Sequence, residues 1–266
     1  MKRKKWKNMI SIYFKSIYCT YKVFLRGRIA YRTAFISELI GIAATVLFYF
    51  FLGSSIKYQR GISYYGTESP LAFILSGMLL EEAFKPLRYN FPLAPEVFYM
   101  TLSSPKPLLL DIIQLWLGIY SYYFIITFAY SFVLLTFCPV NVDLPTLIIF
   151  ILNMIVLSIG LNIITNGVRL IVKKGDPVGL AFKFSEYLLS GRNFPVTIMP
   201  IEIQVIAWIF PQSWAQLVWR KVLFSRLSYA TYTFCIFTMM SLVTFIVGLL
   251  LLRIGINKLY REGVLL

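Results

Sequence analysis

The chain alternates long apolar runs with short polar segments along most of its length. A helix needs about 20 mainly apolar residues to cross the hydrocarbon layer of a membrane. Several runs meet or approach this length, and a weaker run carries Lys183 and Glu186 within it. The pattern predicts six membrane-spanning helices, or five if the weak run is left out. The six ranges are 33–52, 70–84, 108–137, 144–168, 176–190 and 229–252.

The N-terminal region, 1–32, has a different pattern. Aromatic and aliphatic side chains recur between positions 6 and 25 at helical spacing, and lysines and arginines occupy much of the rest. A basic amphipathic helix of this kind lies in the headgroup region of a membrane with its apolar face buried. A helix packed on a soluble domain would look similar, but the sequence leaves no segment for such a domain. We therefore expect an interfacial helix.

The segment between the last two predicted spans is apolar but contains three prolines. Pro195, Pro200 and Pro211 each lack a backbone donor and clash with the preceding helical turn. Backbone that leaves the helical path at membrane depth must be buried in protein or reached by water. Two short helices, 201–210 and 213–223, fit all three prolines. They predict a re-entrant hairpin that dips from the outer surface and does not cross the membrane.

Composition supports the same interpretation. Of the 266 residues, 59% are hydrophobic and 14% are charged, and the mean hydropathy is +0.74. Ordinary globular domains are roughly 45–50% apolar and about 25% charged. A folded core of this size cannot take up the excess apolar surface, so that surface must face lipid. The sequence therefore predicts an all-α polytopic membrane protein.

The net charge of +15 is unevenly distributed. With six spans and a cytoplasmic N-terminus, 19 of the 26 lysines and arginines fall on the inner side. Six fall on the outer side, and Arg192 and Arg220 are among them. Cytoplasmic loops of membrane proteins carry such an excess of basic residues. The distribution favours both termini in the cytoplasm, and it favours contact with anionic lipid over binding of nucleic acid.

Residue types that carry catalysis are scarce. The chain has no histidine and three separated cysteines, and its acids are scattered, so no metal or cofactor site is predicted. It contains no GxxxxGK[ST] sequence, so ATP and its magnesium ion would be bound by another chain. Ionisable residues inside spans often mark function. Lys183 and Glu186 can pair on one helix face, and a structural role is favoured over a substrate site.

The longest predicted cytoplasmic loop, 85–107, contains a candidate contact for an ATPase partner. A helix can begin there at a proline, and an acid in its first turn complements the helix dipole. A short rigid helix with apolar side chains can transmit force to a partner, whereas a helix lying on the membrane is the alternative. The candidate coupling residues are Pro95, Glu96, Val97, Phe98 and Met100.

The sequence LLSGRNFPVTIMPIEIQVIAWIFPQSWAQLVWR resembles the signature region of ABC-2 type permeases. In that family a Ser-Gly pair, an aromatic-Pro pair, a second proline and a third proline before a helix recur in this order. A second segment, LSSPKPLLLDIIQLWLG, is similar to the family's cytoplasmic segment that enters the third span. The resemblance covers essentially the whole chain. The matching signature residues are Ser190-Gly191, Phe194-Pro195, Pro200 and Pro211.

The resemblance implies a single ABC-2 type transmembrane domain over 1–266. Its parts are the amphipathic helix (1–32), spans one to five (33–190), the outer re-entrant segment (191–228), span six (229–252) and a cytoplasmic tail (253–266). Such a permease lies in the plasma membrane, pairs with a second permease subunit and two ATPase subunits, and usually exports its substrate. A homodimer is favoured because symmetric homo-oligomers are the commonest.

The family also implies an outer gate, formed by the re-entrant helices that cap the exit of the pathway. A hydrophobic or amphipathic substrate, such as a drug, a lipid or a glycoconjugate, is favoured. The gate residues in this chain would be Gly191, Phe194, Pro195, Pro200 and Pro211.

Two other classes of function compete with transport. A membrane-embedded enzyme would need a nucleophile with a base, or clustered carboxylates with a metal, and the sequence offers neither pattern. A non-transporting membrane scaffold or immunity protein would need no such chemistry. Stable co-purification with an ATPase would separate a permease from a scaffold.

Overall fold

A computed structural model describes residues 69–89, 140–172, 176–225 and 227–261, with isolated positions between 15 and 51 and at 136 and 138. These parts of the chain are helical and contain no strand. Three groups of predictions lie wholly or mostly outside the described residues. They are the N-terminal helix (1–32), the spans at 33–52 and 108–137, and the coupling residues Pro95, Glu96, Val97, Phe98 and Met100.

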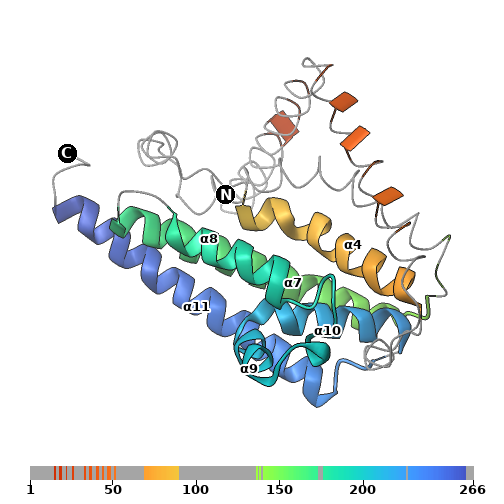
Figure 1. Ribbon diagram of the computed structural model, residues 1–266. Coiled ribbons are helices and arrows are strands. Elements are labelled where there is room, and N and C mark those ends of the chain that lie inside the picture. The colour runs from red at the N-terminus through yellow and green to blue at the C-terminus, as the bar shows by residue number, and fades with distance from the viewer. Residues whose placement is uncertain are drawn as a thin grey trace, which may run out of the picture.

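Two long helices form the axis of the fold (Figure 1). α7 (Leu144–Val172) has 29 residues and α11 (Tyr232–Arg261) has 30. Both are apolar and long enough to cross a membrane, as predicted for 144–168 and 229–252. Only 39% of the most apolar part of α7 and 17% of that of α11 are buried. Exposed apolar surface of this extent is typical of helices that face lipid.

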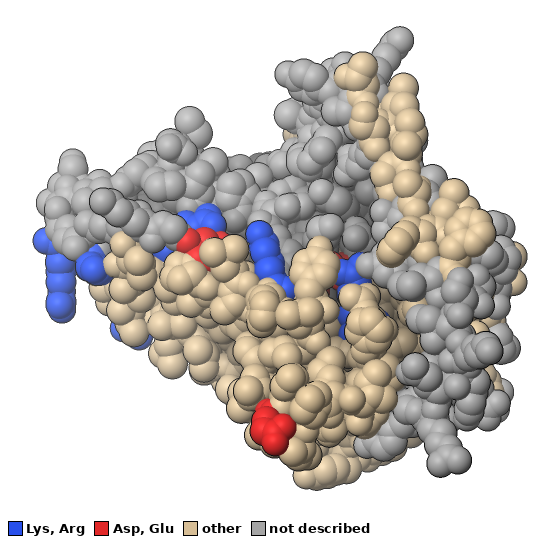
Figure 2. All heavy atoms as spheres, in the orientation of Figure 1, with Lys and Arg blue, Asp and Glu red and all other residues tan. Residues whose placement is uncertain are grey.

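The surface of the molecule agrees with this arrangement (Figure 2). The visible face over α7, α9 and α11 carries few charged side chains, and basic side chains gather at the end where α7 and α11 finish. Arg169 lies in the last turn of α7, and Lys258 and Arg261 lie in the last turn of α11. Both helices thus have their basic residues at the same end.

α7 and α11 lie side by side and run in the same direction. Near their beginnings, Asn153 Nδ2 donates to Thr238 Oγ1 at 3.2 Å. Near their ends, Lys258 Nζ donates to the carbonyl of Ile171 at 2.9 Å. The chain between them must therefore travel back along the whole length of α7.

Four glycines bring the backbones of α7 and α11 close together: Gly160, Gly167, Gly248 and Gly255. A Cβ atom at Gly160 would lie 2.8 Å from the backbone nitrogen of Phe245. A Cβ atom at Gly248 would lie 2.9 Å from the carbonyl oxygen of Gly160. No side-chain rotation can relieve these contacts, because backbone atoms make them. Helices in lipid associate through such close approach at small residues.

α4 (Pro70–Tyr89) packs against α7 and α10 and supplies much of the buried core. Phe73, Met78 and Leu80 are almost completely buried. The apolar part of α4, Pro70–Glu81, is shorter than a usual span. The helix predicted at 70–84 is therefore present, but its apolar length alone does not establish a crossing.

The chain returns from α7 to α11 through short helices (Figure 1). In the figure, α8 and α10 follow one another along α7, and α9 lies to one side. The elements in order are α8 (Pro177–Phe184), the π-helical segment η1 (Ser185–Leu189), the 3-10 helix η2 (Val196–Ile198), α9 (Ile201–Ile209) and α10 (Pro211–Phe224).

α8, η1 and α10 together match the length of α7. α8 and η1 have 8 and 5 residues and α10 has 14, which is about 40 Å of helix at 1.5 Å per residue, against about 43 Å for α7. The far end of α10 reaches the beginning of α7, where the N–H of Asn141 donates to the carbonyl of Leu223 at 2.8 Å. The segment predicted at 176–190 is helical, but at about 20 Å it is too short for a complete crossing.

The three prolines lie at helix ends, as their chemistry requires. Pro195 immediately precedes η2, Pro200 immediately precedes α9, and Pro211 is the first residue of α10. The short helices predicted at 201–210 and 213–223 correspond to α9 and α10. Proline is favoured at the first helical position because its missing N–H would have no helical partner there.

The glycine contact between α7 and α11 predicts a selective effect of added methyl groups. Gly160→Ala should lower the free energy of unfolding by about 1–3 kcal/mol, because the new Cβ overlaps the backbone of α11. Gly41→Ala is the control, since a Cβ there would meet nothing within 4 Å among the described residues outside its own helix. The measurement is equilibrium unfolding of the purified proteins in mixed micelles. Equal stability of the two variants would contradict the close packing.

Candidate functional site

The break between η1 and α10 gathers buried polar side chains from several elements. We call this group the helix-break site. α4, α7, the η1 region and α10 all contribute, and no member is more than 4% exposed. The members are Ser76, Glu81, Ser158, Ser185, Glu186, Ser190, Arg192, Gln212, Ser213, Gln216 and Arg220.

Arg220 is completely buried and connects α10 to the break and to α4. Its guanidinium donates to the carbonyl of Gly191 at 2.9 Å and to that of Arg192 at 2.8 Å. It also donates to the carbonyl of Phe73 at 3.1 and 3.2 Å, and lies 3.6 Å from the centre of that residue's ring. The carbonyls at 191 and 192 have left the helical ladder, so Arg220 replaces the hydrogen bonds that the break removes.

Other carbonyls near the break also receive side-chain donors. Each donor belongs to α9 or α10, and each acceptor lies in the last turn of a preceding helix or just beyond it. The pairs are Ser213 Oγ to Leu189 at 3.0 Å, Gln204 Nε2 to Met199 at 2.7 Å and to Thr197 at 3.2 Å, and Trp214 Nε1 to Trp208 at 2.8 Å. These bonds give these carbonyls donors where irregular backbone lies in an apolar environment.

Glycines make room for this network at two positions. Gly191 has φ of 79°, in the left-handed region that side chains disfavour. A Cβ atom at Gly77 would lie 2.6 Å from Nη2 of Arg220 and 2.7 Å from the carbonyl oxygen of Arg192. Both positions therefore require the smallest residue.

Glu81 of α4 forms a buried ion pair with Arg192. The charge pattern predicted Arg192 and Arg220 on the outer side, and the structure corrects this. Both side chains are buried inside the protein, where their partners are a carboxylate and backbone carbonyls. Taking a charge out of water is costly unless it is paired, so both arginines are bound by the fold rather than by solvent.

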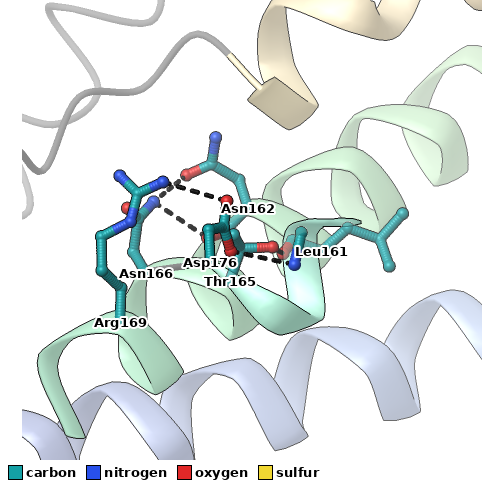
Figure 3. Close-up of polar contacts among 7 residues, drawn as sticks. Leu161, Asn162, Thr165, Asn166, Arg169 and Asp176 are labelled. Atoms are coloured by element: carbon teal, nitrogen blue, oxygen red, sulfur yellow. Dashed lines mark hydrogen bonds and ion pairs between the residues drawn. The ribbon is translucent and has the colours of Figure 1, made fainter. Parts of the chain in front are cut away.

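A polar stripe runs along α7 away from the helix-break site. Ser158, Asn162, Thr165 and Asn166 are buried and recur at intervals of about one helical turn. Asn166 Nδ2 donates to Oδ1 of Asn162 at 2.7 Å and to its carbonyl at 2.9 Å (Figure 3). Ionisable and polar groups aligned in a membrane helix often mark a route for ions or substrates.

The stripe ends at the connection between α7 and α8 (Figure 3). Arg169 Nη2 donates to Oδ2 of Asp176 at 3.0 Å. Asp176 also caps α8, since its Oδ1 accepts from the N–H of Gly179 at 2.9 Å. One carboxylate therefore fixes both the start of α8 and its position beside α7.

The predicted gate residues lie around the break rather than in one cluster. Gly191 and Pro195 are buried, whereas Phe194 and Pro200 are exposed. Pro211 is buried at the start of α10. α9 exposes apolar side chains over most of its surface, among them Ile201, Val205, Ile206 and Ile209. Such a helix needs an apolar environment on its outer side.

The predicted pair of Lys183 and Glu186 spans two environments. Lys183 is exposed, and Glu186 is buried within the π-helical segment. Their pairing stays a prediction, and Glu186 is a member of the helix-break site. Gln212, Gln216 and Arg220 were not predicted as site residues, although their spacing of four residues places them on one face of a helix.

The described residues offer little for catalysis. They contain no group of three or more His, Cys, Asp or Glu residues that could hold a metal ion. Burial raises the pKa of the Cys138 thiol to about 11, so little of it is the reactive thiolate at neutral pH. The buried hydroxyls, amides and charges of the helix-break site are groups that can bind or orient polar ligands.

The role of Arg220 can be tested by substitution. Arg220→Met should lower the free energy of unfolding by roughly 2–6 kcal/mol, because two buried carbonyls lose their donors at about 1–3 kcal/mol each. Arg220→Lys should be intermediate, since one ammonium cannot reproduce the planar fork. Lys221→Met is the matched control, because the neighbouring side chain is partly exposed. Equal stability of all three variants would show that Arg220 does not support the break.

The ion pair predicts non-additive effects. Glu81→Gln and Arg192→Gln should each destabilise the protein, on the order of 3–5 kcal/mol where a charge is left unpaired. The double variant should lose less than both losses combined, by about 0.5–3 kcal/mol. Glu202→Gln, an exposed acid on α9, is the control and should be near neutral. Additive losses in the unfolding measurement would contradict a direct pair.

Comparison with known proteins adds no relative to these observations, since neither any protein-family model nor any curated protein matches the chain.

Proposed function

We propose that this chain is the membrane permease subunit of an ATP-driven transporter of the ABC-2 type, which exports a hydrophobic or amphipathic substrate. The observation that carries the proposal is the path by which the chain returns from the end of α7 to the start of α11, two parallel helices of spanning length. We call this path the broken return: α8 and η1 run along α7, α9 lies to one side, and α10 continues along α7. This order places Pro195, Pro200 and Pro211 at helix ends where the family signature has its prolines.

The broken return also supports a re-entrant outer segment. α10 begins at the helix-break site, beside Leu157 of α7, and ends beside Asn141. Leu157 is 13 residues into a helix that begins at Leu144, or about 20 Å along it. The junction of α9 and α10 would therefore lie near the middle of the membrane, with irregular backbone held by protein donors.

The charge distribution supports cytoplasmic termini in the plasma membrane. The basic ends of α7 and α11 coincide (Figure 2), and positively charged ends favour the cytoplasmic side. Because Arg192 and Arg220 are buried within the protein, they no longer count as outer surface charges. The corrected distribution is more strongly biased toward the inner side than the sequence count of 19 to 6.

The ATPase would be a separate chain, present in two copies beside two copies of this permease, and it would bind ATP and magnesium. The proposed contact is the coupling helix at Pro95–Met100. The connection between α7 and α8, where Arg169 pairs with Asp176, is a second cytoplasmic feature within reach of a partner. The pair would link movement of α8 to α7.

α9 suits the role of an outer gate. It has no side-chain cap at its N-terminus, but Gln204 binds the carbonyls of Thr197 and Met199 and so closes the loop before it. Trp214 fixes the other end through the carbonyl of Trp208. The hairpin would therefore move as one packed unit rather than as a loose loop.

The proposal predicts a specific effect of the coupling helix. Co-expression with an ATPase encoded beside it should yield a stable complex whose ATP hydrolysis depends on the permease. The double change Glu96→Ala and Phe98→Ala should weaken this association about thirtyfold, since an interfacial aromatic anchor contributes on the order of 2 kcal/mol. Insertion into the membrane should be unchanged.

Glu202→Ala serves as the control for this experiment, because this acid lies on α9, on the opposite side in the proposed topology. Unchanged association of the double variant would move the coupling contact elsewhere, with the connection between α7 and α8 as the next site to test. Failure to associate with any ATPase would contradict the permease function itself.

A further inference from the structure

We propose that the helix-break site binds a small monovalent cation of about the size of sodium. The proposed ligands are oxygen atoms of Glu186, Ser190, Gln212 and Gln216. These side chains line one narrow cavity between η1, α4, α7 and α10, together with Leu80, Leu157 and Ala215. The inference does not depend on pairing with an ATPase, because the site lies within this chain.

The orientation of Gln216 presents an acceptor to the cavity. Its Nε2 donates to the carbonyl of Gly77 at 3.2 Å. Its Oε1 is therefore directed away from that bond, and this atom is buried and has no hydrogen-bond partner among the described residues. A buried carbonyl oxygen without a donor is costly, so the site favours a ligand that supplies positive charge.

Gln212 adds a second unpaired amide one helical turn earlier on α10. The residue is 3% exposed, and neither its Nε2 nor its Oε1 makes a hydrogen bond within the described part of the chain. The amide is free to turn its oxygen toward the cavity. Two amide oxygens four residues apart on one helix can converge on a single ion.

The η1 side of the cavity also presents acceptors. The hydroxyl of Ser190 donates its proton to the carbonyl of Glu186 at 2.5 Å and accepts from the N–H of Arg192 at 3.2 Å, so one lone pair remains for a further ligand. The carboxyl of Glu186 carries negative charge when ionised. The carbonyl end of η1 adds the partial negative charge of a helix C-terminus. Single π-helical turns such as η1 occur frequently at functional sites.

Two buried cations near the cavity have partners of their own. Arg192 is paired with Glu81, and the guanidinium of Arg220 is directed to the carbonyls of Phe73, Gly191 and Arg192. Lys183 is exposed on the preceding helix.

The size of the cavity distinguishes a dehydrated ion from a hydrated ion or an organic molecule. The cavity has no room for a whole water molecule, so a hydrated ion or an organic substrate does not fit it as it stands. A dehydrated ion held directly by protein oxygens does fit this description. Carboxylate, amide and hydroxyl oxygens are the ligands that hard cations prefer. Broken membrane helices hold ions in this way, with ligands from the ends of half-helices.

The polar stripe of α7 extends toward the site. It runs from Asp176 and Arg169 at the connection to α8 past Asn166 and Asn162 (Figure 3), and Ser158 follows one turn earlier on α7, next in sequence to the cavity-lining Leu157. The hydroxyl of Ser158 is buried and has no hydrogen-bond partner within the described residues.

The test is thermal unfolding of the full-length purified protein at fixed pH and ionic strength in sodium, lithium, potassium or choline chloride. Sodium should raise the unfolding midpoint relative to choline, with an increment that grows with the logarithm of its concentration above the Kd. Potassium should have a smaller effect because it is larger. An equal midpoint in all four salts would overturn the proposal.

Gln212→Leu should make the protein more stable without sodium and insensitive to it. Removing an unpaired buried amide should raise the unfolding midpoint in choline chloride and abolish the further rise of the midpoint in sodium chloride. Gln204→Leu is the control, since this glutamine binds carbonyls outside the cavity and should leave the increment unchanged even if it lowers the midpoint. A full sodium increment in Gln212→Leu would overturn the assignment of the ligands.

Two further measurements keep the proposal testable if a variant fails to fold. Equilibrium binding of radioactive sodium to the unaltered protein should saturate and be displaced by unlabelled sodium but not by choline. Absence of saturable binding would overturn the site. Stabilisation on lowering the pH, with no dependence on sodium, would identify a proton as the ligand and would also overturn it.

Discussion

The helix break between Leu189 and Pro211 exposes backbone carbonyls that lipid cannot bind, and the fold is arranged around their hydrogen bonds. In an apolar environment each unpaired carbonyl is costly, so a break persists only where protein supplies donors. α9 and α10 supply them through Gln204, Ser213, Trp214 and Arg220. The helices that follow the break therefore also stabilise it.

The same bonds connect the break to the rest of the molecule. Arg220 binds α4 and the backbone after η1 at once, and Glu81 of α4 reaches the same region through Arg192. A movement of α8 would therefore displace α4 and α10 as well. Because α7 and α11 are packed backbone to backbone at glycines, they form the fixed part against which such a movement would occur.

Sequence reasoning predicted the elements better than the contacts between them. The length of the apolar runs was sufficient to predict α7 and α11, and the chemistry of proline was sufficient to predict where α9 and α10 begin. The pairing of Glu81 with Arg192 could not be predicted, because residues 111 positions apart meet only through tertiary packing. The same holds for the joint use of α8 and α10 as one return path, which depends on the parallel direction of α7 and α11.

The depth of α9 in the membrane tests the broken return most directly. Pairing of Asn153 with Thr238, and of Gly160 with Phe245, places Leu242 of α11 level with the helix-break site. Spin labels at Ile209 and Leu242, both exposed, should report similar immersion depths from their relative accessibility to oxygen and to a water-soluble nickel complex in vesicles. A label at Leu144 should be shallower. A label at Ile209 that is as shallow as Leu144, or in water, would contradict a return path broken within the membrane.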